Sequence, residues 1–283
     1  MIALSLSASV GLAQPLVVKG RVESSNVGVG YATLLSLTDA KCGTIANERG
    51  EFELLVARLP QKIIVSALGY ADTVLTLTQN TSQPLNIKLK EKPISLPQLT
   101  INSTSNATFE LGSARQEILK MASNEYYFLQ ANQVGAGVGT VFDTRKNSGV
   151  AHTISVFVVE PKPTKYILTV YALDELGTDY KLYPKKLLIP LINKPVVFMT
   201  EQAGWTDIEN VSVALPDKYL VVLLTRAESN VPPDNEKKGE YPYCIGRQWP
   251  NGAAKRHIYV FGDRYATMAK NDDISAIYIS CQK

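Results

Sequence analysis

The chain has few charges and few cysteines. Charged residues make up 19% of its 283 residues, and the formal net charge is only +3. The sequence has no dense block of lysine and arginine, so we expect neither a nucleic-acid partner nor a polybasic membrane patch. No apolar run reaches about 18 residues, so no segment is predicted to span a bilayer as a helix. Three cysteines are too few for a disulfide scaffold.

Histidine is equally scarce, since the chain contains only His152 and His257. A zinc carboxypeptidase holds its metal with a His-x-x-Glu pair and a distant second histidine. The residues three positions further on are Ser155 and Val260, so the sequence excludes a carboxypeptidase. The cysteines stand too far apart for a short-spaced pair of zinc or iron ligands. We expect no cofactor.

Residues 1–14 have the composition of a secretory signal peptide. They carry no charge, and their apolar run ends in the small residues Gly11-Leu12-Ala13. This pattern predicts cleavage after Ala13, although no basic residue precedes Lys19. An apolar N-terminal strand is the alternative. With a signal peptide, the mature protein is expected to be periplasmic, outer-membrane-associated or secreted.

Residues 15–92 are predicted to form a small β-sandwich. Short apolar or alternating stretches are separated by turn residues, and no helical period occurs. Phe52 and Leu54 alternate with Glu51 and Glu53, which is typical of a strand with one buried face. Gly50 ends the preceding turn and is able to take a positive φ.

Five of these stretches carry a resemblance to a known family by their order and spacing, namely Gly20–Val22, Tyr31–Leu34, Gly43–Leu54, Val65–Tyr70 and Leu85–Leu89. They resemble the carboxypeptidase-regulatory-domain-like proteins. The resemblance implies a transthyretin-like β-sandwich with no peptidase chemistry of its own. Such modules are common at the N-termini of outer-membrane and surface proteins of the Bacteroidetes.

Residues 93–131 are expected to form a linker and one packing helix. Two prolines and the polar run 102–108 show no sustained period. Ser113 and Gln116 have the spacing of a capping box, which predicts that a helix begins there. Apolar residues then recur at helical spacing, so one face of this helix is expected to pack against the next domain.

Residues 132–283 are predicted to form a larger, jelly-roll-like β-sandwich, which makes the whole chain all-β apart from the one helix. Apolar or alternating stretches recur, and glycine, proline, asparagine and aspartate occupy the connections. This part loosely resembles uncharacterised sandwich domains that follow the same N-terminal module, which implies no activity. Strands are expected at 134–142, 152–159, 165–173, 186–192, 195–200, 211–215, 219–226, 257–262 and 274–281.

Tyr241, Tyr243 and Trp249 are the candidate ligand-binding residues. They lie near the polar loop 227–240, and an exposed aromatic side chain, unlike one in a core, indicates a binding surface. Aromatic faces stack on sugar rings, so these residues predict a carbohydrate-binding surface. Trp205 follows a turn glycine and is better explained by packing.

Two further pairs of residues stay open. Cys244 and Cys281 are expected in one exported domain, where they would be able to form a disulfide, but sequence does not give their separation. His152 and His257 are both expected at strand edges. No Gly-x-Ser-x-Gly elbow accompanies them, so a Ser–His–Asp triad is the less favoured interpretation.

Two loop-like patterns have a structural and a functional interpretation. Gly135, Gly137 and Gly139 are similar to a phosphate-binding loop, but a strand follows them in place of a helix, which favours close strand packing. The acidic groups at 234–236 and 271–273 would be able to bind calcium. Solvated loop residues are the simpler explanation.

These observations predict a non-enzymatic, exported binding or scaffolding protein of the cell envelope or surface. Its partner is expected to be an envelope or surface protein or a glycan. One alternative is a carbohydrate-binding module that uses the loop aromatics, and another is a hydrolase with a scattered active site. Fold class alone does not decide between them.

Overall fold

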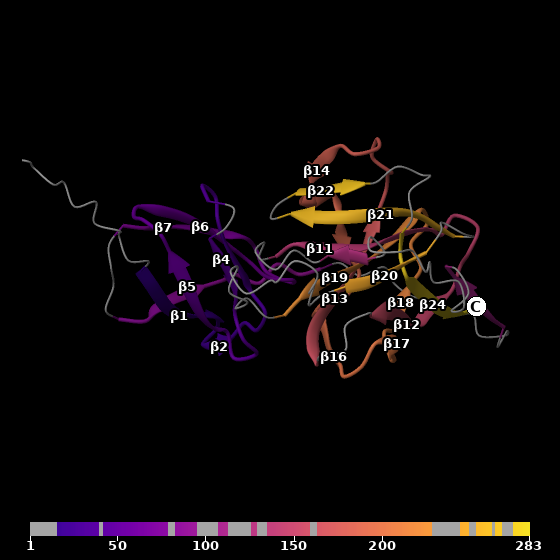
Figure 1. The fold of residues 1–283 in the computed structure, drawn as a ribbon, viewed down its shortest axis with the longest axis horizontal. Helices are drawn as coiled ribbons and strands as arrows, with labels where there is room; N and C mark the ends of the chain where they lie inside the picture. Colours follow the sequence, from indigo (N-terminus) through magenta and orange to yellow (C-terminus); the bar gives the residue numbers. More distant parts are fainter. Residues whose placement is uncertain are drawn as a thin grey trace, which may run out of the picture.

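The computed structural model contains two β-sandwiches that lie side by side (Figure 1). It describes residues 16–39, 42–78, 83–94, 107–112, 126–128, 135–158, 163–227, 244–248, 253–261, 264–267 and 274–283, with backbone alone at 126–128, 244–248 and 261. The predicted all-β class is confirmed. Within these ranges no helix is long and apolar enough to cross a membrane. The helix expected after Ser113 lies outside them.

The first sandwich packs two four-stranded sheets. Its strands are β1 (Leu16–Ser24), β2 (Val27–Gly28), β3 (Thr33–Ser36), β4 (Gly43–Ile45), β5 (Glu51–Val56), β6 (Gln61–Ser66), β7 (Thr73–Leu77) and β8 (Leu85–Lys88). One sheet has the order β2-β1-β5, and β8 pairs in parallel with β1, on the side of β1 that faces away from β5. The other sheet has the order β4-β3-β6-β7.

The alternation predicted for Glu51–Val56 is confirmed. Phe52 and Leu54 are buried in the core of the first sandwich, while Glu51 and Glu53 are exposed. Phe52 lies opposite Gly20 of β1, and a Cβ atom at Gly20 would stand 2.6 Å from Cζ of Phe52. The glycine therefore leaves the space that the aromatic ring fills.

The second sandwich packs two eight-stranded sheets. Its elements are β9 (Thr108–Leu111), β10 (Tyr126–Phe128), β11 (Gly137–Asp143), β12 (Val150–Val158), β13 (Thr164–Leu173), β14 (Leu182–Pro184), the 3-10 helix η1 (Lys185–Leu187), β15 (Ile189–Pro190), β16 (Val196–Thr200), β17 (Gly204–Ile208), β18 (Val213–Ala214), β19 (Tyr219–Arg226), β20 (Cys244–Gln248), β21 (Ala254–Phe261), β22 (Arg264–Thr267), β23 (Ile274–Ser275) and β24 (Ile277–Gln282). The sheet that we call the middle sheet has the order β14-β22-β21-β11-β19-β13-β15, with β16 beside β13. The other, the outer sheet, has the order β10-β20-β12-β24-β9, and β17, β18 and β23 complete it.

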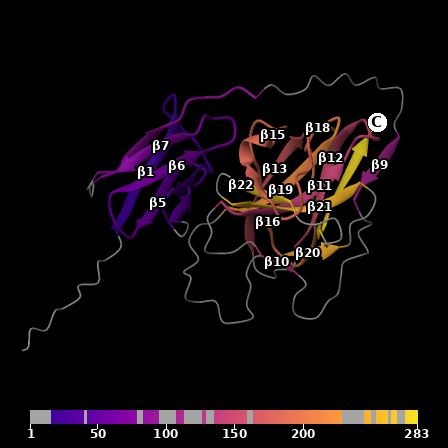
Figure 2. The same ribbon diagram turned by 90° about the horizontal axis from the view of Figure 1, so that it is seen from above.

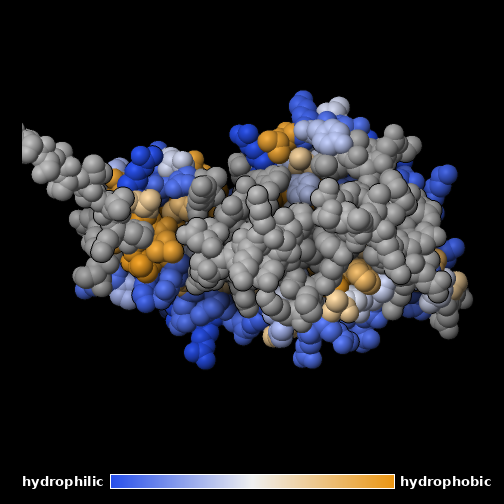
Figure 3. Space-filling model, viewed as in Figure 1, coloured by the Kyte–Doolittle hydropathy of each residue, from blue (hydrophilic) through white to orange (hydrophobic). Residues whose placement is uncertain are grey.

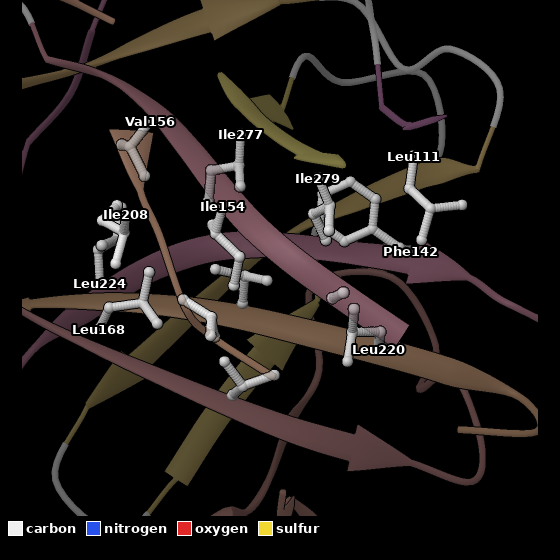
Figure 4. Packing of buried hydrophobic residues seen from close by; sticks show 14 of the residues in the cluster. Leu111, Phe142, Ile154, Val156, Leu168, Ile208, Leu220, Leu224, Ile277 and Ile279 are labelled. Carbon is white, nitrogen blue, oxygen red and sulfur yellow. The ribbon is translucent and has the colours of Figure 1, made fainter. Parts of the chain in front are cut away.

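The middle sheet is buried on both faces, which explains why β19 is apolar almost throughout. Leu220, Val222 and Leu224 belong to the core shared with the outer sheet (Figure 4). Tyr219 and Val221 alternate with them and face a second cluster. Leu176, Tyr183 and Leu188, from the segment after β13, pack against that cluster. Because both faces of β19 are apolar, its sequence shows no alternation of apolar and polar residues.

Residues 93–131, which were expected to form a linker and a helix, contain two strands of the second sandwich. The second sandwich therefore begins before its expected start at residue 132. β9 pairs with β24 at the edge of the outer sheet (Figure 2), and β10 pairs with β20. The strand expected at 186–192 is also shorter, since η1 occupies Lys185–Leu187 and β15 covers only Ile189–Pro190. In the pairing order of the middle sheet, β14 and β15 stand at opposite ends.

Candidate functional site

A cleft of about 580 Å³ lies where the two sandwiches meet. The first sandwich supplies most of the wall, and Ala227, directly after β19, closes one side. The lining residues are Lys19, Gly20, Thr44, Ile45, Asn47, Glu51, Phe52, Glu53, Pro84 and Ala227.

The cleft is lined by both polar and apolar residues. Lys19 Nζ lies 2.6 Å from Glu53 Oε1, and Asn47 Nδ2 donates to Glu51 Oε2 at 2.9 Å. Asn47 Oδ1 also accepts the Glu51 amide, which fixes the turn before β5. Phe52 also lines the cleft, although its ring is buried in the core. These groups are able to exchange hydrogen bonds with a polar ligand, and none is an activated nucleophile.

A polar contact joins the sandwiches next to the cleft. The Tyr31 hydroxyl donates to Glu48 Oε1 at 2.8 Å, and Lys165 Nζ of β13 lies 3.2 Å from the same oxygen. These two partners hold the pKa of Glu48 below its usual value. Burial, followed by the Glu48 contact, raises the pKa of Tyr31 to about 12. The carbonyl of Lys165 also accepts the Ala227 amide, so one residue fixes both the junction and the cleft wall.

An apolar contact joins the sandwiches at a second point. Leu68, in the turn between β6 and β7, packs against the cluster on the second face of the middle sheet. Gly69 follows with a φ of +86°. A Cβ atom at Gly69 would lie 3.2 Å from the Asn193 carbonyl oxygen. The turn therefore reaches the second sandwich with its backbone as well as with a side chain.

The structure separates the two histidines. His152 is exposed and occupies an irregularity in the pairing of β12 with β24. His257 is fully buried within the middle sheet, which corrects the strand-edge prediction. Its Nδ1 atom lies 3.1 Å from Ser275 Oγ. Because both side chains of this Ser–His pair have 0% exposure, the pair has no access to a substrate.

The disulfide left open between Cys244 and Cys281 is absent, because Cys281 is a free, buried thiol. Cys281 pairs with Ala151 of β12, whereas Ile245, next to Cys244, pairs with Val158. Seven residues of strand, roughly 23 Å, separate these positions, and a disulfide needs Cα atoms within about 7 Å. Burial raises the pKa of the Cys281 thiol to about 12, so it is not a reactive nucleophile.

The predicted aromatic surface stays a prediction, because Tyr241, Tyr243 and Trp249 lie outside the described residues. Trp205 is described and belongs to β17. Its ring meets Phe157 of β12 edge-on at 5.5 Å, in agreement with the packing role expected from its position.

The glycines of β11 serve strand packing. Gly137 and Gly139 lie in the middle of the sheet, between β19 and β21. A Cβ atom at Gly139 would overlap the Val222 carbonyl, which explains glycine there without a phosphate. The acidic groups at 234–236 and 271–273 lie outside the described residues. Within the described ranges, no cluster of three or more His, Cys, Asp or Glu residues is arranged to hold a metal ion.

Comparisons with known proteins assign no family. No protein-family model and no curated protein matches this chain. A solved structure of the cysteine protease and lectin-like domains of Cwp84, a surface layer associated protein of Clostridium difficile, is similar over 86% of this chain and 46% of that chain. The sequence identity is 9% and the TM-score is 0.37. This chain thus spans less than half of that one, and the likeness supports no inference about function.

Proposed function

We propose that this protein is a non-enzymatic binding protein of the cell envelope or surface, and that its ligand enters the cleft between the sandwiches. The cleft is the observation that carries the proposal. It brings carboxylates, an ammonium group and an amide together with apolar residues. Lys165, the neighbour of the cleft across the junction, pairs with Glu48 of the first sandwich.

A glycan is the ligand class that we favour. Sugars present many hydroxyl groups, which match the acceptors and donors of Glu51, Glu53 and Lys19. The aromatic residues Tyr241, Tyr243 and Trp249 predicted from the sequence favour the same ligand class, because aromatic faces stack on sugar rings. The alternative, an envelope protein as partner, uses the same polar surface.

We also propose that the first sandwich is a carboxypeptidase-regulatory-domain-like module and that the protein is exported. Two four-stranded sheets and the left-handed backbone of Gly50 and Gly69 support the first part. Export rests on the composition of residues 1–14. The hydrolase alternative gains no support from His257, whose side chain is enclosed by the core.

A glycan array followed by calorimetric titration of the best ligand tests this proposal. Glu53→Gln keeps the shape of the side chain and removes its charge, and we expect it to weaken binding by about tenfold. Glu110→Gln, on the exposed edge strand β9, is the matched control and leaves affinity unchanged. Equal affinities of both variants would place the ligand elsewhere. Turnover of the ligand would refute the non-enzymatic assignment.

A further inference from the structure

Residues 180–189, which we call the basic apolar segment, expose an unusual share of apolar surface. Ten large apolar side chains are exposed among the described residues, and four of them belong to this segment. The four are Tyr180, Leu182, Leu187 and Ile189, with exposed fractions of 58%, 49%, 46% and 45%. In Figure 3 a hydrophobic area flanked by strongly hydrophilic groups lies at the top of the second sandwich, where Figure 1 places β14.

The charge around these side chains has one sign. Lys181, Lys185 and Lys186 lie between them. No aspartate or glutamate occurs from residue 180 to residue 200, and Lys194 adds a fourth positive charge within that stretch. The preceding acid, Asp179, forms an ion pair with Arg256. The segment is therefore positive as well as apolar.

The fold keeps the exposed side chains from turning inward. Tyr183 stacks on Tyr265 with ring centroids 5.5 Å apart, and its hydroxyl lies 2.8 Å from Thr178 Oγ1. Leu188 is buried in the cluster on the second face of the middle sheet. These residues anchor the segment to the middle sheet, so that its other side chains stay on the surface.

We propose that the basic apolar segment binds the surface of an anionic phospholipid bilayer. The leucine, isoleucine and tyrosine side chains enter the interfacial region, and the lysines contact the lipid phosphates. Exposed apolar groups interleaved with lysines in one short segment favour this partner over an acidic protein, because a bilayer surface accepts both kinds of side chain. The sequence has no dense basic block, so the apolar side chains supply the second attraction that stable attachment requires.

Sedimentation of the full chain with lipid vesicles tests the proposal. The chain is expected to bind vesicles of phosphatidylcholine and phosphatidylglycerol, and to release them as salt is raised. The variant Leu182→Ser/Leu187→Ser should bind at least about tenfold more weakly. Leu55→Ser in the first sandwich replaces a leucine that is 59% exposed, and this control should bind as the parent does.

A second variant guards against misfolding. Lys185→Gln/Lys186→Gln leaves the apolar side chains in place and should weaken binding to anionic vesicles while keeping the parent circular dichroism and melting curve. Equal binding to pure phosphatidylcholine, or no binding to either vesicle, would overturn the proposal. Binding of soluble polyglutamate without vesicle binding would also overturn it, and would point to an acidic protein partner.

Discussion

Replacing Phe52 with alanine tests the packing of the first sandwich, in whose core its ring is buried. Phe52 is 5% exposed, and its ring fills the space that Gly20 leaves open. Truncation removes the buried ring and leaves a cavity beside a glycine that has no side chain to fill it. Phe→Ala changes in such sites cost about 3–5 kcal/mol, and we expect a loss in this range.

The measurement should follow the first sandwich alone. Global unfolding of a two-domain chain is not a two-state process, so hydrogen exchange of peptides covering residues 16–24 and 51–56 is the suitable assay. Leu55→Ala is the matched control on the same strand, because Leu55 is 59% exposed, and its effect should stay within about 0.5 kcal/mol. A loss below about 1 kcal/mol for Phe52→Ala, or equal effects of both changes, would refute the register of β5.

Cys42 and Cys281 have pKa values raised by burial to about 11 and about 12, so neither thiol should react with iodoacetamide until the chain is denatured. Gly139→Ala should destabilise the second sandwich by more than about 3 kcal/mol in its melting or exchange behaviour, because the added Cβ overlaps the backbone of β19. The pKa of Glu48 is lowered, so its contact with the second sandwich persists at neutral pH and is lost as the pH falls below the ordinary carboxyl value of 4.5. Small-angle scattering should then show a larger radius of gyration. An unchanged radius would mean that the remaining contacts, including that of Leu68, hold the junction without Glu48.

Strands were predicted correctly where apolar and polar residues alternate or where a long apolar run occurs. The alternation at Glu51–Val56 and the apolar run at Tyr219–Arg226 are both strands. β9 was missed because its four residues end a polar stretch and its partner, β24, lies far along the chain. His257 was misplaced because a strand with two buried faces has no polar side on which periodicity would show it.

The candidate site was harder to predict than the fold. Its polar residues are ordinary exposed positions of β1 and β5, and the turn before β5 adds Asn47. The second sandwich adds Ala227 to these residues, and Ala227 is held by the carbonyl of Lys165. Such proximity depends on tertiary packing, and no local motif records it. The aromatic residues that sequence did single out, Tyr241, Tyr243 and Trp249, await a direct test.

The position of β24 determines the order in which the chain is able to fold during synthesis. β24 lies between β12 and β9, so Gln282 pairs with both Val150 and Thr108. The first sandwich contains all its strands by Lys88 and is able to fold while the rest of the chain is still being made. The second sandwich has to hold β9 and β12 apart until β24 leaves the ribosome. Its unpaired strand edges are exposed throughout that interval, so slow elongation at this stage should favour aggregation or capture by chaperones.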